Sequence, residues 1–239
     1  MYRNTFLSVM FLACCFNGSL CAQSDAQIYE RTCDAKTYPF SDPSPVATPN
    51  NSYYPYFRFD GFSMQAQEKQ WKMVVLENDY VKLTVTTEIG GTIWGAIDKV
   101  NNKEFVYTNG VVKFRDVAMR GPWTSGGIEF NFGIIGHAPT CSTPIDYLTK
   151  KNVDGSVSCH IFSYEWITRT VWNVEINLPK DKAYFTTHTT WFNQSSIDQP
   201  YYQWMNAGYA TKTGTRFYYP GTYSIGPVSY TPLTLPTNR

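Results

Sequence analysis

The feature that most constrains the fold of this chain is an alternation of apolar and polar residues in the segment Thr168–Pro179, which is strict from Trp172 to Leu178. A repeat of two is the period of a β-strand, because successive side chains of a strand point to opposite faces of its sheet. One buried face and one wet face are typical of antiparallel sheets. The apolar set is Trp172, Val174, Ile176 and Leu178, and the polar set between them is Asn173, Glu175 and Asn177.

The same pattern recurs in shorter runs along the chain from Trp71 onward. The runs are KMVVLEN, DYVKLTVTTE, GTIWGAIDK, KEFVYT, AYFTTHTTWFNQ, YYQWMNAGYAT and TRFYYPG, and most are bounded by Asn, Asp or Gly. Short alternating runs punctuated by turn residues indicate strands joined by turns. No helical period of useful length interrupts them. The sequence therefore predicts an all-β fold of antiparallel strands.

Composition narrows the class of protein. Of the 239 residues, 43% are hydrophobic and 17% are aromatic, which is ample for a packed core and argues against disorder. A formal net charge of +1 gives no reason to expect a nucleic acid or an anionic membrane as partner. Seven Trp and eighteen Tyr beside three His favour a stacking surface over a metal centre. We expect neither a metal nor an organic cofactor.

The first 22 residues are typical of an export signal. Arg3 supplies a positive charge, and the apolar run Thr5–Phe16 is too short to span a bilayer. We predict cleavage after Ala22 and a protein that is periplasmic, on the cell surface or secreted. A lipoprotein signal at Cys14 is the alternative, which we favour less because Cys14 falls early in the apolar run. No later run is long and apolar enough to cross a membrane.

The rest of the chain divides into three parts. Residues 23–70 are rich in Pro, Ser and Tyr and predict an extended lead-in along the surface, since their prolines forbid a helix. Residues 71–227 hold the alternating runs and form the predicted β domain. Residues 228–239, which continue VSYTPLTLPTNR, resemble a translated sequencing adapter. We therefore predict that this tail is not native and that the β domain is incomplete at its C-terminus; a genuine Pro/Thr-rich tail is the alternative.

Three cysteines lie beyond the predicted signal, namely Cys33, Cys141 and Cys159, and their spacing matches no metal site. In an oxidising compartment Cys141 and Cys159 would be able to close one disulfide and leave Cys33 free. Three unpaired buried thiols are the equally weighted alternative, because the geometry that decides a disulfide is not visible in a sequence.

The stretch Lys113–His137 concentrates polar and aromatic groups among glycines in a chain that is only 16% charged. A strand that begins near Gly127 would present Glu129 and Asn131 on one face and place Ile128, Phe130 and Phe132 on the other. Polar side chains beside aromatic rings suit a sugar, which offers hydroxyl edges and C–H faces. The stretch therefore predicts a carbohydrate site.

Two residues of this predicted site suit proton transfer. His137 lies on a glycine-flanked loop and Glu129 is the nearby carboxylate, so this pair is the candidate for acid/base catalysis. The alternatives are a turn histidine bonded to the backbone and a buried carboxylate paired with Arg115 or Arg120, which would lower the pKa of Glu129. The residues predicted to bind the sugar are Arg115, Arg120, Trp123, Asn131, Trp204 and Asn206.

Three segments carry a resemblance to a known family: LENDYVKLTVTTEIGGTIWGAIDK, FRDVAMRGPWTSGGIEFNFGIIGHAPT and YYQWMNAG. They resemble a bacterial family of unknown function whose exported members carry a β domain before tetratricopeptide repeats. The resemblance covers roughly Trp71–Gly226 and implies a supersandwich similar to galactose mutarotases. It also implies that His137 stands for the first sugar-binding His of those enzymes. Gln203–Asn206 depart from their pattern, and their late catalytic Glu has no counterpart here.

Together these observations predict a carbohydrate-binding domain of an exported carbohydrate-active protein. The intact protein would be a glycosidase or an epimerase-like enzyme that uses acid/base chemistry, with the fragment itself inactive. A non-catalytic glycan-binding or scaffold module of a repeat-containing protein is the alternative, because one fold of this kind supports several functions.

Overall fold

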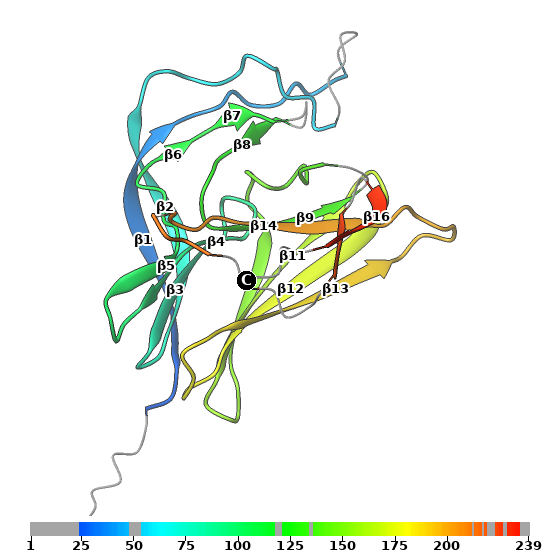
Figure 1. Cartoon of the computed structure of the whole chain (residues 1–239). Coiled ribbons are helices and arrows are strands. Elements are labelled where there is room, and N and C mark those ends of the chain that lie inside the picture. Colours follow the sequence, from blue (N-terminus) through cyan, green and yellow to red (C-terminus); the bar gives the residue numbers. More distant parts are fainter. Residues whose placement is uncertain are drawn as a thin grey trace, which may run out of the picture.

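The computed structural model of the chain is built of β-strands throughout the part of the sequence that it describes (Figure 1). The described residues are 24–47, 54–117, 121–133, 136–211, 213–216, 218, 223–226 and 229–234. No helix within these ranges is long and apolar enough to cross a membrane. The all-β class predicted from the alternating runs is confirmed.

The larger of the two main sheets has eight strands. Seven of them follow the order β14-β9-β4-β3-β2-β1-β6, and β5 pairs with β4. All neighbours are antiparallel except β1 and β6, which form a short parallel pair. The strands are β1 (Gln27–Tyr38), β2 (Gln67–Glu77), β3 (Val81–Thr86), β4 (Thr92–Asp98), β5 (Lys103–Val106), β6 (Val112–Lys113), β9 (Ile128–Gly133) and β14 (Tyr202–Ala207).

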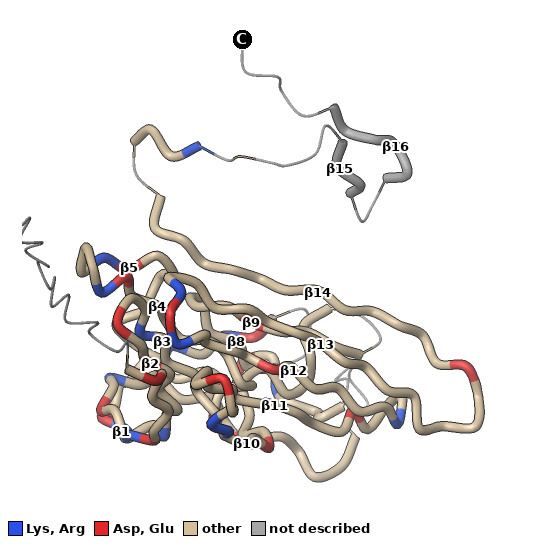
Figure 2. Tube along the Cα trace, turned by 90° about the horizontal axis from the view of Figure 1, so that it is seen from below, with Lys and Arg blue, Asp and Glu red and all other residues tan. Residues whose placement is uncertain are grey.

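The smaller main sheet is a four-stranded antiparallel meander of β10 (Asp146–Lys151), β11 (Val157–Glu165), β12 (Thr170–Leu178) and β13 (Thr186–Asn193). Two short hairpins complete the description, β7 (Arg115–Asp116) with β8 (Pro122–Trp123) and β15 (Tyr223–Gly226) with β16 (Ser229–Thr234). Charged residues gather on β1–β5 and β10, whereas β13 and β14 carry none (Figure 2).

The core lies between the two main sheets, so the molecule is a β-sandwich. The alternation that begins at Thr168 forms β12, whose apolar face is buried while Asn173, Glu175 and Asn177 stay partly exposed. Trp172 stacks on Phe132 of the other sheet, with ring centroids 4.6 Å apart and planes 9° from parallel. Inward side chains of β2, β3, β4, β9, β11 and β12 build the rest of this core. Burying them supplies the main driving force for folding.

The segment predicted to be a surface lead-in contains a strand of the sandwich. β1 pairs with β2 along its length, from Gln27 opposite Glu77 to Thr37 opposite Gln67. Its many polar residues suit an edge-side strand, because only part of each face is covered. The β domain therefore begins well before Trp71. The proline-rich residues that follow β1 form irregular structure over 41–47, as expected from the prolines.

A second apolar cluster lies on the outer face of the large sheet, opposite the sandwich core. It consists of Trp71, Met73, Ile89, Trp94, Val112 and Phe114, with Phe40 packed against it. The large sheet is thus apolar on both faces near β2 and β4. Its outer face is the one that carries the candidate site.

Two predictions about the ends of the chain concern residues that are not or only partly described. The predicted export signal, residues 1–22, lies outside the described residues. Within the predicted non-native tail, Ser229–Thr234 form β16, and residues 235–239 lie outside the description. Both predictions stay predictions.

Candidate functional site

The site is built on β9, whose residues alternate between the two faces of the large sheet. Ile128, Phe130 and Phe132 belong to the sandwich core. Glu129 and Asn131 therefore point to the outer face, as the alternation in the sequence predicts. Both are nonetheless buried, with 6% and 0% of their surface exposed, so other segments must cover them.

One covering element is β14, which pairs with β9 at the edge of the sheet. Trp204 stands opposite Asn131, and Asn206 stands opposite Glu129. Directly opposed residues of an antiparallel pair share a face, so the two strands bring these four side chains together. The amide of Asn206 donates a hydrogen bond from Nδ2 to Oε2 of Glu129 at 3.3 Å.

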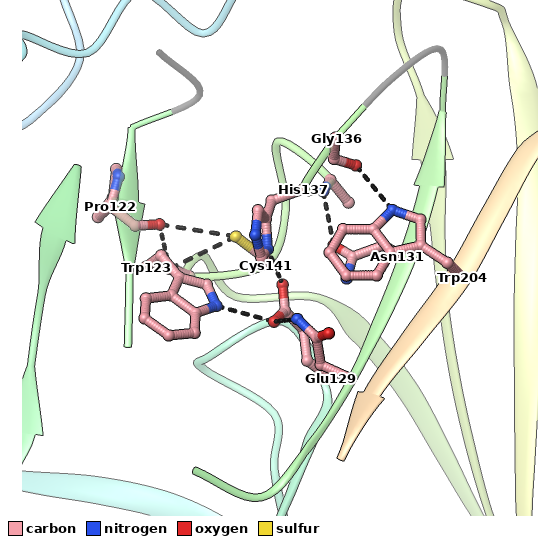
Figure 3. A network of polar contacts seen from close by, with 11 residues as sticks. Pro122, Trp123, Glu129, Asn131, Gly136, His137, Cys141 and Trp204 are labelled. Atoms are coloured by element: carbon pink, nitrogen blue, oxygen red, sulfur yellow. Dashed lines mark hydrogen bonds and ion pairs between the residues drawn. The ribbon is translucent and has the colours of Figure 1, made fainter. Parts of the chain in front are cut away.

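The carboxylate of Glu129 is the centre of the cluster (Figure 3). Its Oε2 also accepts the indole N–H of Trp123 at 2.8 Å, and its Oε1 lies 2.8 Å from Nδ1 of His137. The three partners come from β8, from β14 and from the loop after β9. Glu129 thus ties the hairpin before β9 and the loop after β9 to β14, whose Asn206 is 77 residues further along the chain.

Two opposing effects set the pKa of Glu129. Burial raises it, because desolvation disfavours the charged form. The hydrogen bonds from His137 and Trp123, the charge of His137 and the bond from Asn206 lower it and outweigh burial, so the pKa lies below its usual value. Glu129 is therefore an anion at neutral pH. The sequence raised this outcome as an alternative, with arginine partners in place of the ones observed.

His137 lies between two indoles. Its ring centroid is 5.6 Å from that of Trp123 and 4.8 Å from that of Trp204 (Figure 3). Because a carboxylate only accepts hydrogen bonds, Nδ1 of His137 carries the proton that faces Glu129. In the neutral ring Nε2 then holds a lone pair, and it makes no hydrogen bond with another described residue.

The loop that presents His137 is fixed by two further hydrogen bonds. The indole N–H of Trp204 donates to the carbonyl of Gly136 at 3.2 Å, and the amide of Ala138 donates to Oδ1 of Asn131 at 2.8 Å. The Nδ2 group of Asn131 is buried and has no partner among the described residues. An unsatisfied buried donor costs about 1–3 kcal/mol. Asn131 therefore offers a donor without a partner inside the cluster.

Trp123 reaches Glu129 because the chain reverses at Gly126 and Gly127. Both have positive φ, +99° and +69°. A Cβ on Gly127 would lie 2.3 Å from the carbonyl oxygen of Ile93 in β4, so only glycine fits at this position. The short hairpin of β7 and β8 delivers Trp123 on the other side of the turn.

The structure describes only one of the two arginines that were predicted to bind sugar. Arg115 pairs in register with Trp123, but its guanidinium donates to the carbonyl of Phe114 at 2.8 Å and lies 4.5 Å from the ring centre of Phe62. None of these contacts reaches Glu129 or His137. Arg120 lies outside the described residues.

A second layer of residues behind the cluster was not predicted from the sequence. Cys141 is buried behind it, and its Sγ donates to the carbonyl of Pro122 at 3.6 Å; Ser142 donates to the same carbonyl (Figure 3). Burial, and then the negative charge of Glu129, raise the pKa of Cys141 to about 12. The only signal in the sequence was the closeness of Cys141 to His137.

The cysteines decide between the two alternatives left open by the sequence. Cys33, Cys141 and Cys159 are all free thiols in the structure. The Cys141–Cys159 disulfide is therefore not present, and both residues pack as small apolar groups in separate places. Among the described residues no group of three or more His, Cys, Asp or Glu is placed to hold a metal ion.

The fold and the cluster define the class of protein as a β-sandwich with a buried carboxylate–histidine pair on the outer face of its larger sheet. Residues 48–231 match the family described as Domain of unknown function (DUF5107). Because the match covers most of the chain, the protein belongs to that family.

A solved structure supports the same fold. The chain is 26% identical to a TPR-domain containing protein from Parabacteroides distasonis, with a TM-score of 0.70. The likeness covers 77% of this chain and 32% of that one, so this chain spans about a third of the length of the protein it matches. The part of the sequence-based prediction that named a family of unknown function and a relative with tetratricopeptide repeats is confirmed.

Proposed function

We propose that this protein is the carbohydrate-binding domain of an exported carbohydrate-active protein, and that the glycan binds at the Glu129–His137 cluster. The observation that carries the proposal is the position of His137, held by a buried carboxylate between two indoles. A ligand that has both hydroxyl groups and an apolar face would contact both the imidazole and the two indoles.

In the Glu129–His137 pair, the role of the carboxylate is to orient the imidazole. Glu129 fixes the tautomer and the ring plane of His137, so that Nε2 is the atom left to accept a sugar hydroxyl. The three hydrogen bonds on Glu129 are all made inside the protein. We therefore assign Glu129 a positioning role in place of the direct acid/base role predicted from the sequence.

Aromatic and amide groups complete the proposed contacts. Trp123 and Trp204 flank the ring of His137 and are both partly exposed, so they offer faces for the C–H groups of a sugar. Asn131 is fully buried and contributes indirectly, because its Oδ1 accepts the amide of Ala138 and so holds the loop that presents His137. Asn206 contributes indirectly by holding Glu129.

Catalysis is the further step of the proposal, in a longer protein of the galactose-mutarotase type. His137 would transfer the proton as a base, and a second group of opposite role would come from beyond this sandwich. Glycoside cleavage by the usual route needs two carboxyl groups that act on the substrate. Glu129 alone does not meet this requirement because its oxygens are already occupied.

A non-catalytic scaffold is the second candidate function. It is favoured by one observation, that the similar solved structure is described as a TPR-domain containing protein. In that case the sandwich would organise neighbouring repeats, and the cluster would act as a structural brace.

The test begins with the full chain on an array of neutral and acidic glycans, followed by titration with the best saccharide. We expect His137→Ala to weaken binding about tenfold or more if the chain is a binder, since one buried hydrogen bond and the packing of two indoles are lost. An enzyme would instead lose turnover of that saccharide while it keeps most of its affinity. His188→Ala, in the exposed strand β13, is the matched control.

Absence of binding to any saccharide by the folded chain would overturn the proposal and favour the scaffold. Equal losses in His137→Ala and His188→Ala would show that the glycan binds at a different site.

A further inference from the structure

A cavity lined by both apolar and charged residues lies on the outer face of the large sheet, apart from the Glu129–His137 cluster. Its volume is about 370 Å³, within the range of small-ligand sites. It extends across strands β1 to β5 and the loop after β5. Residues that line it include Arg31, Lys82, Thr84, Trp94, Glu104 and Thr108.

A β-bulge forms the floor of this cavity. The register between β3 and β4 shifts between Thr84, which faces Gly95, and Val85, which faces Ile93, so Trp94 is the extra residue. Ile93 points into the sandwich core, while Trp94 packs on the outer face beside Met73. Bulges of this kind redirect side chains and are frequent next to functional sites. Here the bulge turns an indole towards the cavity.

The absence of a side chain at Gly95 makes room for Thr108 in the lining of the cavity. A Cβ at Gly95 would lie 2.0 Å from Oγ1 of Thr108, so Thr108 occupies the space that another residue would take. The hydroxyls of Thr84 and Thr108 both line the cavity. Its floor therefore combines an aromatic edge with two groups that donate and accept hydrogen bonds.

The rim of the cavity carries charged side chains that are unpaired or only loosely paired with other described residues. Neither Arg31 nor Glu104 makes a side-chain hydrogen bond or ion pair with another described residue. Lys82 is only loosely paired, with Nζ 3.6 Å from Oε2 of Glu77 and nearly a third of its side chain exposed. By contrast, Glu30 next to Arg31 on β1 is bound to Lys72 at 3.0 Å and to Tyr147. Asp34, a second carboxylate of the lining, lies on the opposite face of β1 from Arg31. On the face that Arg31 shares, two cations and the carboxylate of Glu104 thus lie around one aromatic floor.

We propose that this cavity is a second glycan subsite, specific for a sugar residue that bears a carboxylate, such as a uronic acid. The inference rests on the proposed function, because it adds a subsite to the same carbohydrate-binding face. Arg31 binds the sugar carboxylate through its fork of N–H donors, and Lys82 adds positive charge. Glu104 and the two threonines bind hydroxyl groups. Trp94 supports the C–H face of the ring.

Cys33 provides a reporter inside the cavity. It lines the wall two residues after Arg31, on the same face of β1, and it is a half-buried free thiol. Cys141 and Cys159 are buried at 6% and 0% exposure. A bound sugar should therefore slow the alkylation of Cys33 and leave the other two unchanged.

The experiment titrates the full chain with oligogalacturonate and with the same oligosaccharide after methyl esterification, which removes the charge and keeps the rings. In parallel, iodoacetamide labelling of Cys33 is followed by peptide mass spectrometry. We expect Arg31→Gln to weaken oligogalacturonate binding about tenfold, the loss typical of one hydrogen bond to a charged group. The same substitution should change binding of the methyl ester less than twofold. Lys150→Gln, an exposed cation on β10, is the control for net charge.

The outcomes separate this inference from the proposed function. Binding that depends on Arg31 and protects Cys33, but is unaffected by His137→Ala, supports the second subsite and overturns the proposed primary site. Binding that depends on His137 but not on Arg31, without protection of Cys33, overturns the second subsite alone. If neither saccharide binds and Cys33 is not protected, the second subsite is overturned. The proposed function is then decided separately, by whether the chain binds any neutral glycan of the array.

Discussion

Glu129 shows how much a single buried carboxylate can organise. Three side chains from three separate segments donate to its two oxygens, and they lower its pKa despite the opposing effect of burial. A carboxyl group whose pKa is lower in the folded than in the unfolded state stabilises the fold above its unfolded pKa. That stability is lost as the pH falls from about 4.5, the ordinary value, through the lower folded value.

The first prediction follows from this linkage. Glu129→Gln should be less stable than the natural protein by about 1–3 kcal/mol at pH 7, because a charge-assisted hydrogen bond is lost. The difference should shrink as the pH falls from 5 to 3, where the natural residue also becomes neutral. Urea unfolding across this pH range measures it, with Glu68→Gln at the exposed start of β2 as control. A difference that stays constant with pH would contradict the account.

The second prediction concerns the thiols. Burial raises the pKa of Cys159 to about 12, and burial with the charge of Glu129 does the same for Cys141. Because only the thiolate reacts readily, both should resist alkylation at pH 8 in the folded protein while Cys33 reacts. Peptide mass spectrometry before and after unfolding distinguishes them. Rapid labelling of Cys141 in the native state would show that the layer behind the cluster is open.

At the scale of elements, the turn at Gly127 decides whether Trp123 can reach Glu129. Gly127→Ala adds a clash with the carbonyl of Ile93 to the cost of a positive φ. Gly136→Ala is a matched control, because Gly136 has the same φ of +69° and no atom within 4 Å of the added Cβ. The control should cost about 1–2 kcal/mol, and Gly127→Ala about 1–3 kcal/mol more. Similar losses of unfolding free energy would mean that β4 moves aside easily.

The elements with strong alternation were the predictable ones. β12 and β9 follow from the period of two, whereas the pairing of β14 with β9 is what brings Trp204 and Asn206 to the face that carries Glu129. β1 was not foreseen, because the prolines after it and its polar residues suggested a lead-in. The two-residue strands that place Trp123 carry no periodic signal at all. They form because the chain turns back at Gly121, so that Pro122–Trp123 run antiparallel to Arg115–Asp116.

The site was predictable as a set of residue types and less so as an arrangement. Alternation within β9 put Glu129 and Asn131 together. The partners of Glu129 depend on strand register across 77 residues and on a hairpin, which no local pattern encodes. Of the two arginine partners suggested by charge, Arg115 contacts other groups and Arg120 lies outside the described residues, and the observed partners are His137, Trp123 and Asn206. The cavity around Trp94 depends on a bulge, which the sequence did not reveal.

At the scale of the whole molecule, the sandwich is open along β14. Met205 pairs with Phe130 and shares its core-facing side, yet 51% of its surface is exposed. Phe192 of β13 is 59% exposed. Unpaired strand edges with exposed apolar groups favour association between chains. We therefore expect the chain to self-associate as its concentration rises.

Met205→Lys should reduce this association, because a charge on the open edge opposes contact between copies. Thr149→Lys on β10, an exposed strand at the edge of the smaller sheet, adds the same charge far from β14 and should have little effect. Light scattering coupled to size exclusion measures both. A natural protein that remains monomeric at every concentration would contradict the prediction.

The central claim is that a glycan contacts the indoles beside His137. Its most direct test is the ¹H–¹⁵N spectrum of the tryptophan indoles during titration with the saccharide selected on the array. If the glycan binds there, the Nε1–H signals of Trp123 and Trp204 should shift until binding saturates, while that of Trp172, stacked in the core, stays fixed. Saturable binding with no shift at Trp123 or Trp204 would contradict it.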